Sequence, residues 1–210
     1  MITVHHLNNS RSQRILWLCE ELGTGYDIKF YVRDTTTNLA PPELRAVHPL
    51  GKSPVIEDGD IKVADSGAIV DYLIRTYGAG RLMPVAGTAT HEAYLEWLHF
   101  AEGSAMLPFL LNLYTMRLGD AAAPLKPRID EQIDSHLKFF DGALGDNDWL
   151  VGNALSGADV MMSFVAEIAA MQQRGADYPR LVAYARRIQA LPAWQRAAAK
   201  SAPYAFTVPA

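Results

Sequence analysis

The sequence contains a single cysteine, Cys19, among 210 residues, which excludes an internal disulfide bond. It has no excess of positive charge, because 19 lysines and arginines stand against 23 aspartates and glutamates. A nucleic-acid partner, which usually requires a basic face, is therefore not expected. No apolar run approaches the roughly 18 residues of a membrane span, and the first residues, MITVHHL, show no signal pattern. We expect a cytoplasmic protein without a membrane partner.

Half of the residues are hydrophobic, so the chain can form a sizeable core. The first 78 residues mix two kinds of pattern, and the order is strand, helix, strand, then two strands and a helix. A small α/β domain is therefore predicted over 1–78. Its strands are expected at 2–7 and 26–32 and in a hairpin over 53–65 that turns at Asp58-Gly59, and its helices at 12–22, 41–47 and 65–77.

The remainder of the chain is helical almost throughout. Residues 79–88 are rich in glycine and proline and are predicted to be a linker. An all-α, bundle-like domain is expected over 89–210. Its helices are predicted at 91–118, with a bend near Gly103 and Pro108, and at 126–144, 157–174, 178–191 and 192–200.

Small polar residues crowd the start of the first predicted helix, where Asn8, Asn9, Ser10 and Ser12 lie within five positions. Such residues commonly cap a helix by accepting hydrogen bonds from its free first-turn N–H groups. The same place also favours an anion, because the helix dipole is positive there. The residues alone leave both interpretations open.

Four separated segments resemble the motifs of the cytosolic glutathione transferases, in the right order and on the same two-part layout. They are NNSRSQR at 8–14, HPLGKSPVIEDGD at 48–60, ADSGAIVDYL at 64–73 and LVGNALSGADV at 150–160. The resemblance covers nearly the whole chain and points to a serine-type bacterial member. It implies a thioredoxin-like N-terminal domain followed by a helical domain, and an enzyme that uses glutathione as co-substrate without a metal.

The resemblance implies that a hydroxyl in the polar turn stabilises the thiolate of glutathione. Ser10 is the expected catalytic residue, because it stands four positions before Arg14, as in serine-type members. Asn9 and Ser12 remain alternatives, and the amide of Asn9 is a serious rival donor. Arg14 either polarises the loop around Ser10 or forms a surface salt bridge.

The second motif implies the contacts to the middle and the glycyl end of glutathione. Pro54 is expected to follow a cis peptide bond, and the backbone of Val55 to pair with the cysteinyl part of the tripeptide. Ser53 occupies a position where the family usually has valine. Lys52 is expected at the glycyl carboxylate, since its ammonium group is a compact positive charge.

The third motif implies the contacts to the γ-glutamyl end. Ser66, at a helix start, is expected to hold the carboxylate, and Asp65 replaces the commoner glutamate near the ligand amine. The family also pairs two subunits, so we expect a homodimer. Glu102 is the candidate to reach the amine in the partner subunit, with His99 as its rival.

An apolar second substrate is expected, because one segment of the helical domain is rich in methionine, aromatic and leucine residues. Met106, Phe109, Leu110 and Tyr114 are the candidates to line its pocket. The sequence identifies neither the electrophile nor the pathway. It leaves open whether conjugation or peroxide reduction dominates. The alternative function is a non-catalytic module that binds glutathione or another protein on the same fold.

Three further features are interpreted as structural. Cys19 lies among apolar helix positions and is expected to be a buried thiol. His5 and His6 alternate along a strand, point to opposite faces and lack partners at metal-ligand spacing, so no metal is expected. Residues 156–159, SGAD, match a capping box at the start of an apolar helix.

Overall fold

The computed structural model describes residues 1–172, 176–201 and 203–208. The chain forms two compact units. One contains residues 1–83 together with the described residues from 186 onward, and the other contains residues 84–185. The boundary therefore falls inside helix α8 (Pro179–Ala190). The sequence analysis had placed everything from 89 to 210 in one domain, whereas the last helix packs with the first unit.

The first unit is built on a four-stranded mixed sheet in the order β2-β1-β3-β4. Strand β1 (Ile2–Leu7) is parallel to β2 (Tyr26–Tyr31) and antiparallel to β3 (Val55–Asp58). Strand β4 (Ile61–Ala64) completes an antiparallel hairpin with β3. The hairpin loop consists of residues 59–60, one position beyond the predicted turn, and Gly59 has a φ of 59° there.

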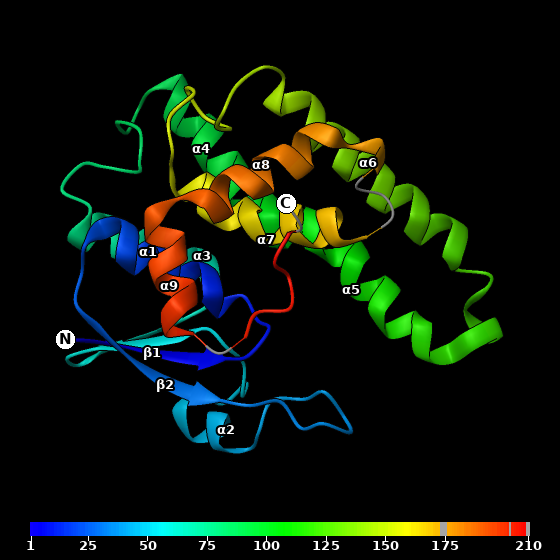
Figure 1. The fold of residues 1–210 in the computed structure, drawn as a ribbon, viewed down its shortest axis with the longest axis horizontal. Coiled ribbons are helices and arrows are strands. Elements are labelled where there is room, and N and C mark those ends of the chain that lie inside the picture. Colours follow the sequence, from blue (N-terminus) through cyan, green and yellow to red (C-terminus); the bar gives the residue numbers. More distant parts are fainter. Residues whose placement is uncertain (173–175, 202, 209–210) are drawn as a thin grey trace. The chain divides into compact units, whose positions relative to one another are not determined.

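Helices cover both faces of this sheet. Helices α1 (Ser12–Leu22) and α3 (Ser66–Tyr77) pack against each other, and α1 also contacts β1. The short α2 (Glu43–Val47) lies on the opposite side of the strands from α1 (Figure 1). There Leu44 packs with Leu7 and Tyr31. Alternation along β1 thus directs Leu7 toward α2 and its neighbour His6 toward α1.

Helix α9 (Pro192–Lys200) lies beside α1 (Figure 1). Arg196 and Lys200 of α9 both bind the carboxylate of Glu20, which is mostly buried and also accepts from the hydroxyl of Tyr26 at 2.8 Å. These contacts, made across about 176 residues of sequence, attach the C-terminal segment to the first helix.

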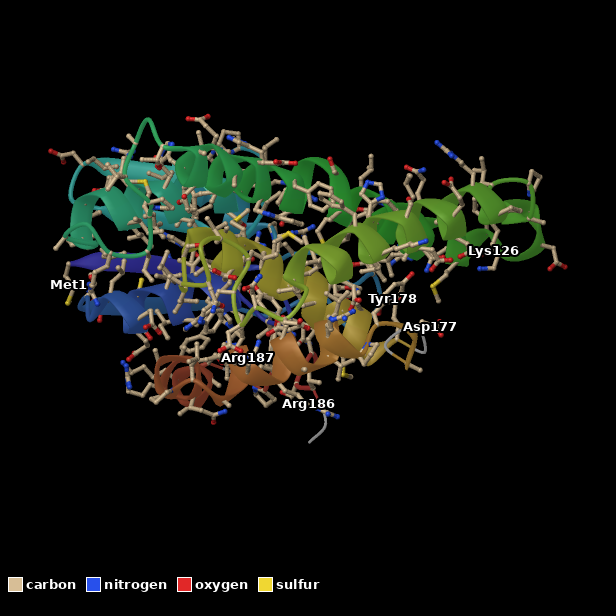
Figure 2. The ribbon with its side chains drawn as sticks, turned by 90° about the horizontal axis from the view of Figure 1, so that it is seen from above. Met1, Lys126, Asp177, Tyr178, Arg186 and Arg187 are labelled. Atoms are coloured by element: carbon tan, nitrogen blue, oxygen red, sulfur yellow. The ribbon has the colours of Figure 1, made fainter. Side chains whose placement is uncertain are left out.

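The second unit is helical. It contains α4 (Ala89–Phe100), a π-helical turn η1 (Ala101–Ala105), α5 (Met106–Thr115), a 3₁₀ segment η2 (Met116–Ala122), α6 (Lys126–Leu144), α7 (Gly157–Met171) and the first part of α8. Most side chains of α7 are buried. Tyr178, labelled in Figure 2, precedes α8, and its hydroxyl donates to the carbonyl of Asp134 in α6 at 3.2 Å.

The long helix predicted over 91–118 is interrupted as expected near Gly103, which lies in the π-helical turn η1. Pro108 does not end the following helix. A helical proline cannot donate to the carbonyl four residues earlier, and here that carbonyl belongs to Ser104 within η1. The helix predicted over 157–174 ends at Met171, and residues 173–175 lie outside the described residues.

Candidate functional site

The polar turn lies between the end of β1 and the start of α1. Asn8 accepts a hydrogen bond from the backbone N–H of Arg33 at 2.8 Å, and the guanidinium of Arg33 donates back to the Asn8 carbonyl at 3.2 Å. Asn9 has a φ of 51°, a left-handed conformation that asparagine tolerates better than most residues. The turn is therefore tied to the segment that follows β2.

Asn9 also contacts the C-terminal segment. Its side-chain Oδ1 accepts from the backbone N–H of Ala205 at 2.8 Å. This contact fixes the orientation of the carboxamide, so its Nδ2 group occupies the other arm and stays a candidate donor. The half-buried Asn9 therefore remains a candidate donor beside Ser10.

A chain of side-chain hydrogen bonds joins Ser10, Ser12 and His6. The two serine Oγ atoms are 2.7 Å apart, and Ser12 Oγ lies 2.9 Å from Nδ1 of His6. Ser12 is fully buried and Ser10 is 5 % exposed. The hydroxyl of Ser12 is thus covered by protein, which argues against Ser12 as the group that touches a ligand.

The turn acts only in part as a conventional helix cap. Ser10 Oγ accepts from the backbone N–H of Ser12 at 3.2 Å, while the N-cap residue Arg11 makes no side-chain capping bond. No acidic residue stands in the first turn of α1. Arg14 is 2 % exposed, so the expectation of a surface salt bridge was wrong.

Burial lowers the pKa of His6 to about 4, so its imidazole is neutral near pH 7. Sequence reasoning had not included His6 among the site residues. Its strand position showed that it faces away from His5, but nothing in the sequence indicated that α1 would bring Ser12 to its ring. His5, by contrast, has its Nδ1 2.9 Å from the hydroxyl of Tyr31.

The loop before β3 is joined to β1 by Ser53. Its Oγ donates to the carbonyl of His5 at 2.8 Å and accepts from the N–H of Leu7 at 3.2 Å. The peptide bond between Ser53 and Pro54 is cis, which confirms that expectation. The serine that replaces the family's usual valine therefore holds the loop in place through its hydroxyl.

Val55 is less suited to pair with a ligand than expected. It is fully buried and lies opposite His5 of β1 on one side and Ala64 of β4 on the other. The backbone N–H and C=O of a strand residue point to the same side of the strand. At Val55 one side faces β1 and the other faces β4, so neither side is free for a ligand. Ser53 precedes β3, so its backbone lies outside the strand pairing and is better placed to bind a ligand.

Asp65 and Ser66 form the start of α3. Asp65 Oδ1 accepts from the N–H of Gly67 at 3.0 Å, and Asp65 has a φ of 75° and a ψ of 131°. A non-glycine residue is uncommon in this region, and such conformations cluster at functional sites. Ser66 is buried as the first helical residue, whereas Lys52 is exposed on its loop.

The remaining predicted site residues belong to the second unit. Glu102 lies in the π-helical turn, a distortion that is frequent at functional sites. Met106 and Phe109 of α5 are 2 % and 5 % exposed, Leu110 is half-buried, and Tyr114 is 58 % exposed. The first two side chains therefore pack inward, while Tyr114 is open to solvent.

Cys19 is a fully buried free thiol, as expected, and burial raises its pKa to about 12. It is therefore a poor nucleophile at neutral pH. Among the described residues, no group of three or more histidine, cysteine, aspartate or glutamate side chains is placed to hold a metal ion. None of the described helices is long and apolar enough to cross a membrane.

Comparison with known proteins identifies the family to which this fold belongs. The model of the glutathione S-transferase N-terminal domain matches residues 1–75, and that of the C-terminal domain matches residues 100–192. The chain is 34 % identical over 178 residues to glutathione S-transferase 3 of Schizosaccharomyces pombe, which covers 78 % of this chain and 72 % of that protein.

Solved structures agree with these matches. A crystal structure of a glutathione S-transferase from Actinobacillus pleuropneumoniae superimposes with a TM-score of 0.87 at 36 % identity, covering 95 % of this chain and 92 % of the other. A sphingomonad glutathione S-transferase complexed with glutathione gives a TM-score of 0.77 at 25 % identity, with 93 % and 96 % covered. The thioredoxin-like sheet, the polar turn at α1 and the helical unit accordingly identify this chain as a member of the glutathione S-transferase family.

Proposed function

We propose that the protein conjugates glutathione to small apolar electrophiles in the cytoplasm, with Ser10 as the residue that stabilises the thiolate. The observation that supports this role is the hydrogen-bond chain from His6 through Ser12 to Ser10, in which Ser10 is the one of the two serines that retains some exposure. The N-terminal end of α1 adds a positive dipole beside the same hydroxyl.

The energy required is within the range of such a contact. A free thiol of the cysteine type has a pKa of about 8.5, and lowering it by about two units needs roughly 2.7 kcal/mol. One hydrogen bond to a charged acceptor contributes about 1.5–3 kcal/mol. Ser10 therefore needs only to donate its proton in a hydrogen bond, and no deprotonated serine is required.

The rest of the tripeptide would be held by the loop before β3 and the start of α3. Lys52 carries the charge for the glycyl carboxylate, and the open backbone at Ser53 is the place for the strand-like pairing first assigned to Val55. At α3, Ser66 offers its hydroxyl and first-turn N–H to the γ-glutamyl carboxylate. Asp65 caps the helix with Oδ1, which leaves Oδ2 for the ligand amine.

The electrophile pocket and the dimer are proposals that rest on the second unit. Leu110 and Tyr114 are the more accessible pocket candidates, whereas Met106 and Phe109 support the helix from within. In a homodimer, Glu102 is the proposed contact to the ligand amine of the partner subunit. Sedimentation of a 23.1 kDa particle at working concentration would contradict the dimer.

The catalytic assignment is tested by comparing Ser10→Ala with Asn9→Ala. Ser10→Ala is expected to retain most glutathione affinity, because the proposed carboxylate contacts lie elsewhere. Turnover with a chloro-nitroaromatic substrate should fall about thirtyfold at neutral pH for a loss of about 2 kcal/mol. The pH profile of kcat/KM should move to higher pH, since the bound thiol would ionise less readily.

The matched variant decides between the two candidates. If Asn9→Ala loses rate and pH dependence while Ser10→Ala keeps both, Asn9 is the thiolate donor. A protein that is retained on immobilised glutathione but shows no turnover would instead be the non-catalytic binding module. Assays with an organic hydroperoxide alongside the chloro-nitroaromatic substrate would show which of the two reactions dominates.

A further inference from the structure

The hydroxyl of Ser12 lies near four hydrogen-bonding groups, but it has only one proton to donate. It accepts from the N–H of Leu7 at 3.3 Å and lies at the same distance from the Leu7 carbonyl. It is also within hydrogen-bond distance of Ser10 Oγ and of Nδ1 of His6. A hydroxyl donates one hydrogen bond and accepts two, so the direction of each contact depends on the others.

The tautomer of His6 determines that direction. If Nδ1 carries the proton, Ser12 accepts from His6 and from the Leu7 N–H. Its own proton then goes to Ser10 Oγ at 2.7 Å, which is closer than the competing Leu7 carbonyl at 3.3 Å. Ser10 then accepts from both the hydroxyl and the N–H of Ser12. With two acceptor sites filled, Ser10 can only direct its proton outward.

The other tautomer reverses the direction of the hydrogen bonds between His6, Ser12 and Ser10. If Nδ1 is unprotonated, Ser12 donates to His6 and accepts from Ser10. Ser10 then presents a lone pair outward, which a thiolate would oppose. The distances are the same in both cases, so the difference lies only in where the protons sit.

We propose that His6, acting through Ser12, is a positioning residue whose Nδ1–H tautomer orients the hydroxyl of Ser10 toward the thiolate of bound glutathione. This inference rests on the proposed function of Ser10 and extends it by two buried residues. His6 and Ser12 do not touch the ligand, and they act by fixing the polarity of the hydroxyl that does.

His6 does not act as a base that removes the thiol proton. Its pKa of about 4 lies roughly 4.5 units below that of a free thiol, so transfer to the ring is disfavoured by about thirty thousandfold. Burial of the ring, rather than a neighbouring charge, lowers this pKa. The ring of Phe30 from β2 packs against the His6 ring in a T-shaped arrangement, with centroids 5.7 Å apart.

The test measures the pKa of enzyme-bound glutathione by thiolate absorbance in a set of variants. His6→Phe and Ser12→Ala should each raise this pKa by about one unit. From a value of about 6.5 to one of about 7.5, this lowers the thiolate fraction and the conjugation rate about threefold at neutral pH. His6→Asn, which can place an amide N–H near the Nδ1 position, should recover part of the shift. Glutathione affinity and the thermal unfolding midpoint of each variant serve as folding controls.

His5→Phe is the matched control. His5 is the adjacent strand residue, equally buried, and its Nδ1 lies near the hydroxyl of Tyr31 instead of the serine chain. This variant should leave the thiol pKa unchanged. An equal shift in His5→Phe and His6→Phe would overturn the proposal, because it would show a general effect of the strand.

Combining each change with Ser10→Ala separates this inference from the proposed function. In the Ser10→Ala background, His6→Phe should cause no further pKa shift, since the hydroxyl it orients is absent. A full additional shift there would contradict the proposal. If Ser10→Ala alone leaves the thiol pKa unchanged, the assignment of Ser10 fails. If it raises the pKa while His6→Phe does not, only the role of His6 fails.

A spectroscopic measurement tests the tautomer itself. In the glutathione complex at neutral pH, the ¹⁵N chemical shifts of the His6 ring should identify Nδ1 as protonated and Nε2 as unprotonated. The reverse assignment would overturn the proposal even if the kinetic variants behave as expected. This readout does not depend on any variant that fails to fold.

Discussion

Helices α1 and α7 both begin beside serine hydroxyls, but their first turns are completed in different ways. At α7, the buried carboxylate of Asp159 accepts from the N–H and the hydroxyl of Ser156, from the N–H of Leu150 and from the hydroxyl of Tyr184, all within 2.8–3.0 Å. At α1, the hydroxyls bind each other and a neutral imidazole, and the first turn contains no acidic residue.

The difference is the source of the negative charge. Helix α7 carries its own anion in a capping box, so its start is satisfied without a ligand, as the SGAD pattern had predicted. Helix α1 has donors and a dipole but no anion of its own, which suits a start that receives the thiolate of a substrate. The two turns therefore differ because only the start of α7 is closed by an acidic side chain of the protein.

The largest expected effect comes from removing the anion at α7. Asp159→Ala would leave three buried donors and one half-buried donor without their acceptor, and the free energy of unfolding should fall by about 4 kcal/mol. Urea titration followed by circular dichroism measures this loss. Asp130→Ala, at an exposed ion pair with Lys126, is the control and should cost less than about 0.5 kcal/mol.

A smaller loss of stability is expected from His6, beside the start of α1, when the pH falls. The folded-state pKa of His6 is about 4 and the unfolded value is 6.5, so between these values the unfolded chain binds a proton that the folded chain does not. The stabilisation from neutral His6 is complete above about pH 6.5 and is lost as the pH falls toward 4, by about 3 kcal/mol in all. Urea midpoints across this window provide the measurement.

The variant His6→Phe isolates this contribution. Because this variant has no imidazole at position 6, its free energy of unfolding should change less with pH than that of the wild type between about pH 4 and 6.5. The difference in slope should correspond to about one proton. The pKa of His5 is also lowered, chiefly by burial, and this residue contributes equally to both proteins. Parallel pH profiles for the two proteins would refute the assignment of the proton to His6.

The smallest effect is expected where the loop before β3 meets β1. Ser53→Ala removes one hydrogen bond to the His5 carbonyl, while the N–H of Leu7 retains its contact with Ser12. The free energy of unfolding should fall by about 1 kcal/mol, with little change in turnover. A large loss of turnover without a matching loss of stability would show that the Ser53 hydroxyl itself, and not only its backbone, contacts the ligand.

Local signals predicted the elements well where they coincide with a clear boundary. The helix at 126–144 has Pro127 in its first turn and Gly145 just beyond its end, and both limits were predicted correctly. The thioredoxin-like order of strands and helices was also confirmed. The hairpin turn was misplaced by one residue, because Asp58-Gly59 and Gly59-Asp60 are equally good turn pairs by composition.

Contacts between distant segments could not be predicted in the same way. The link from Glu20 to Arg196 and Lys200 depends on where the last helix packs, which no local pattern encodes. The partnership of His6 with Ser12 depends likewise on which strand face α1 covers. The roles of Ser10, Lys52 and the other ligand contacts stay predictions, since they follow from the resemblance and from residue chemistry.

The bond between Asn9 and the N–H of Ala205 has a consequence for the order in which the protein is made. Ala205 is synthesised 196 residues after Asn9, so the nascent chain carries the polar turn without this partner until residue 205 has been made. The strands around it are complete once residue 64 has emerged. The turn that contains Ser10 therefore reaches its final set of contacts only after residue 205 has emerged, long after the strands beside it.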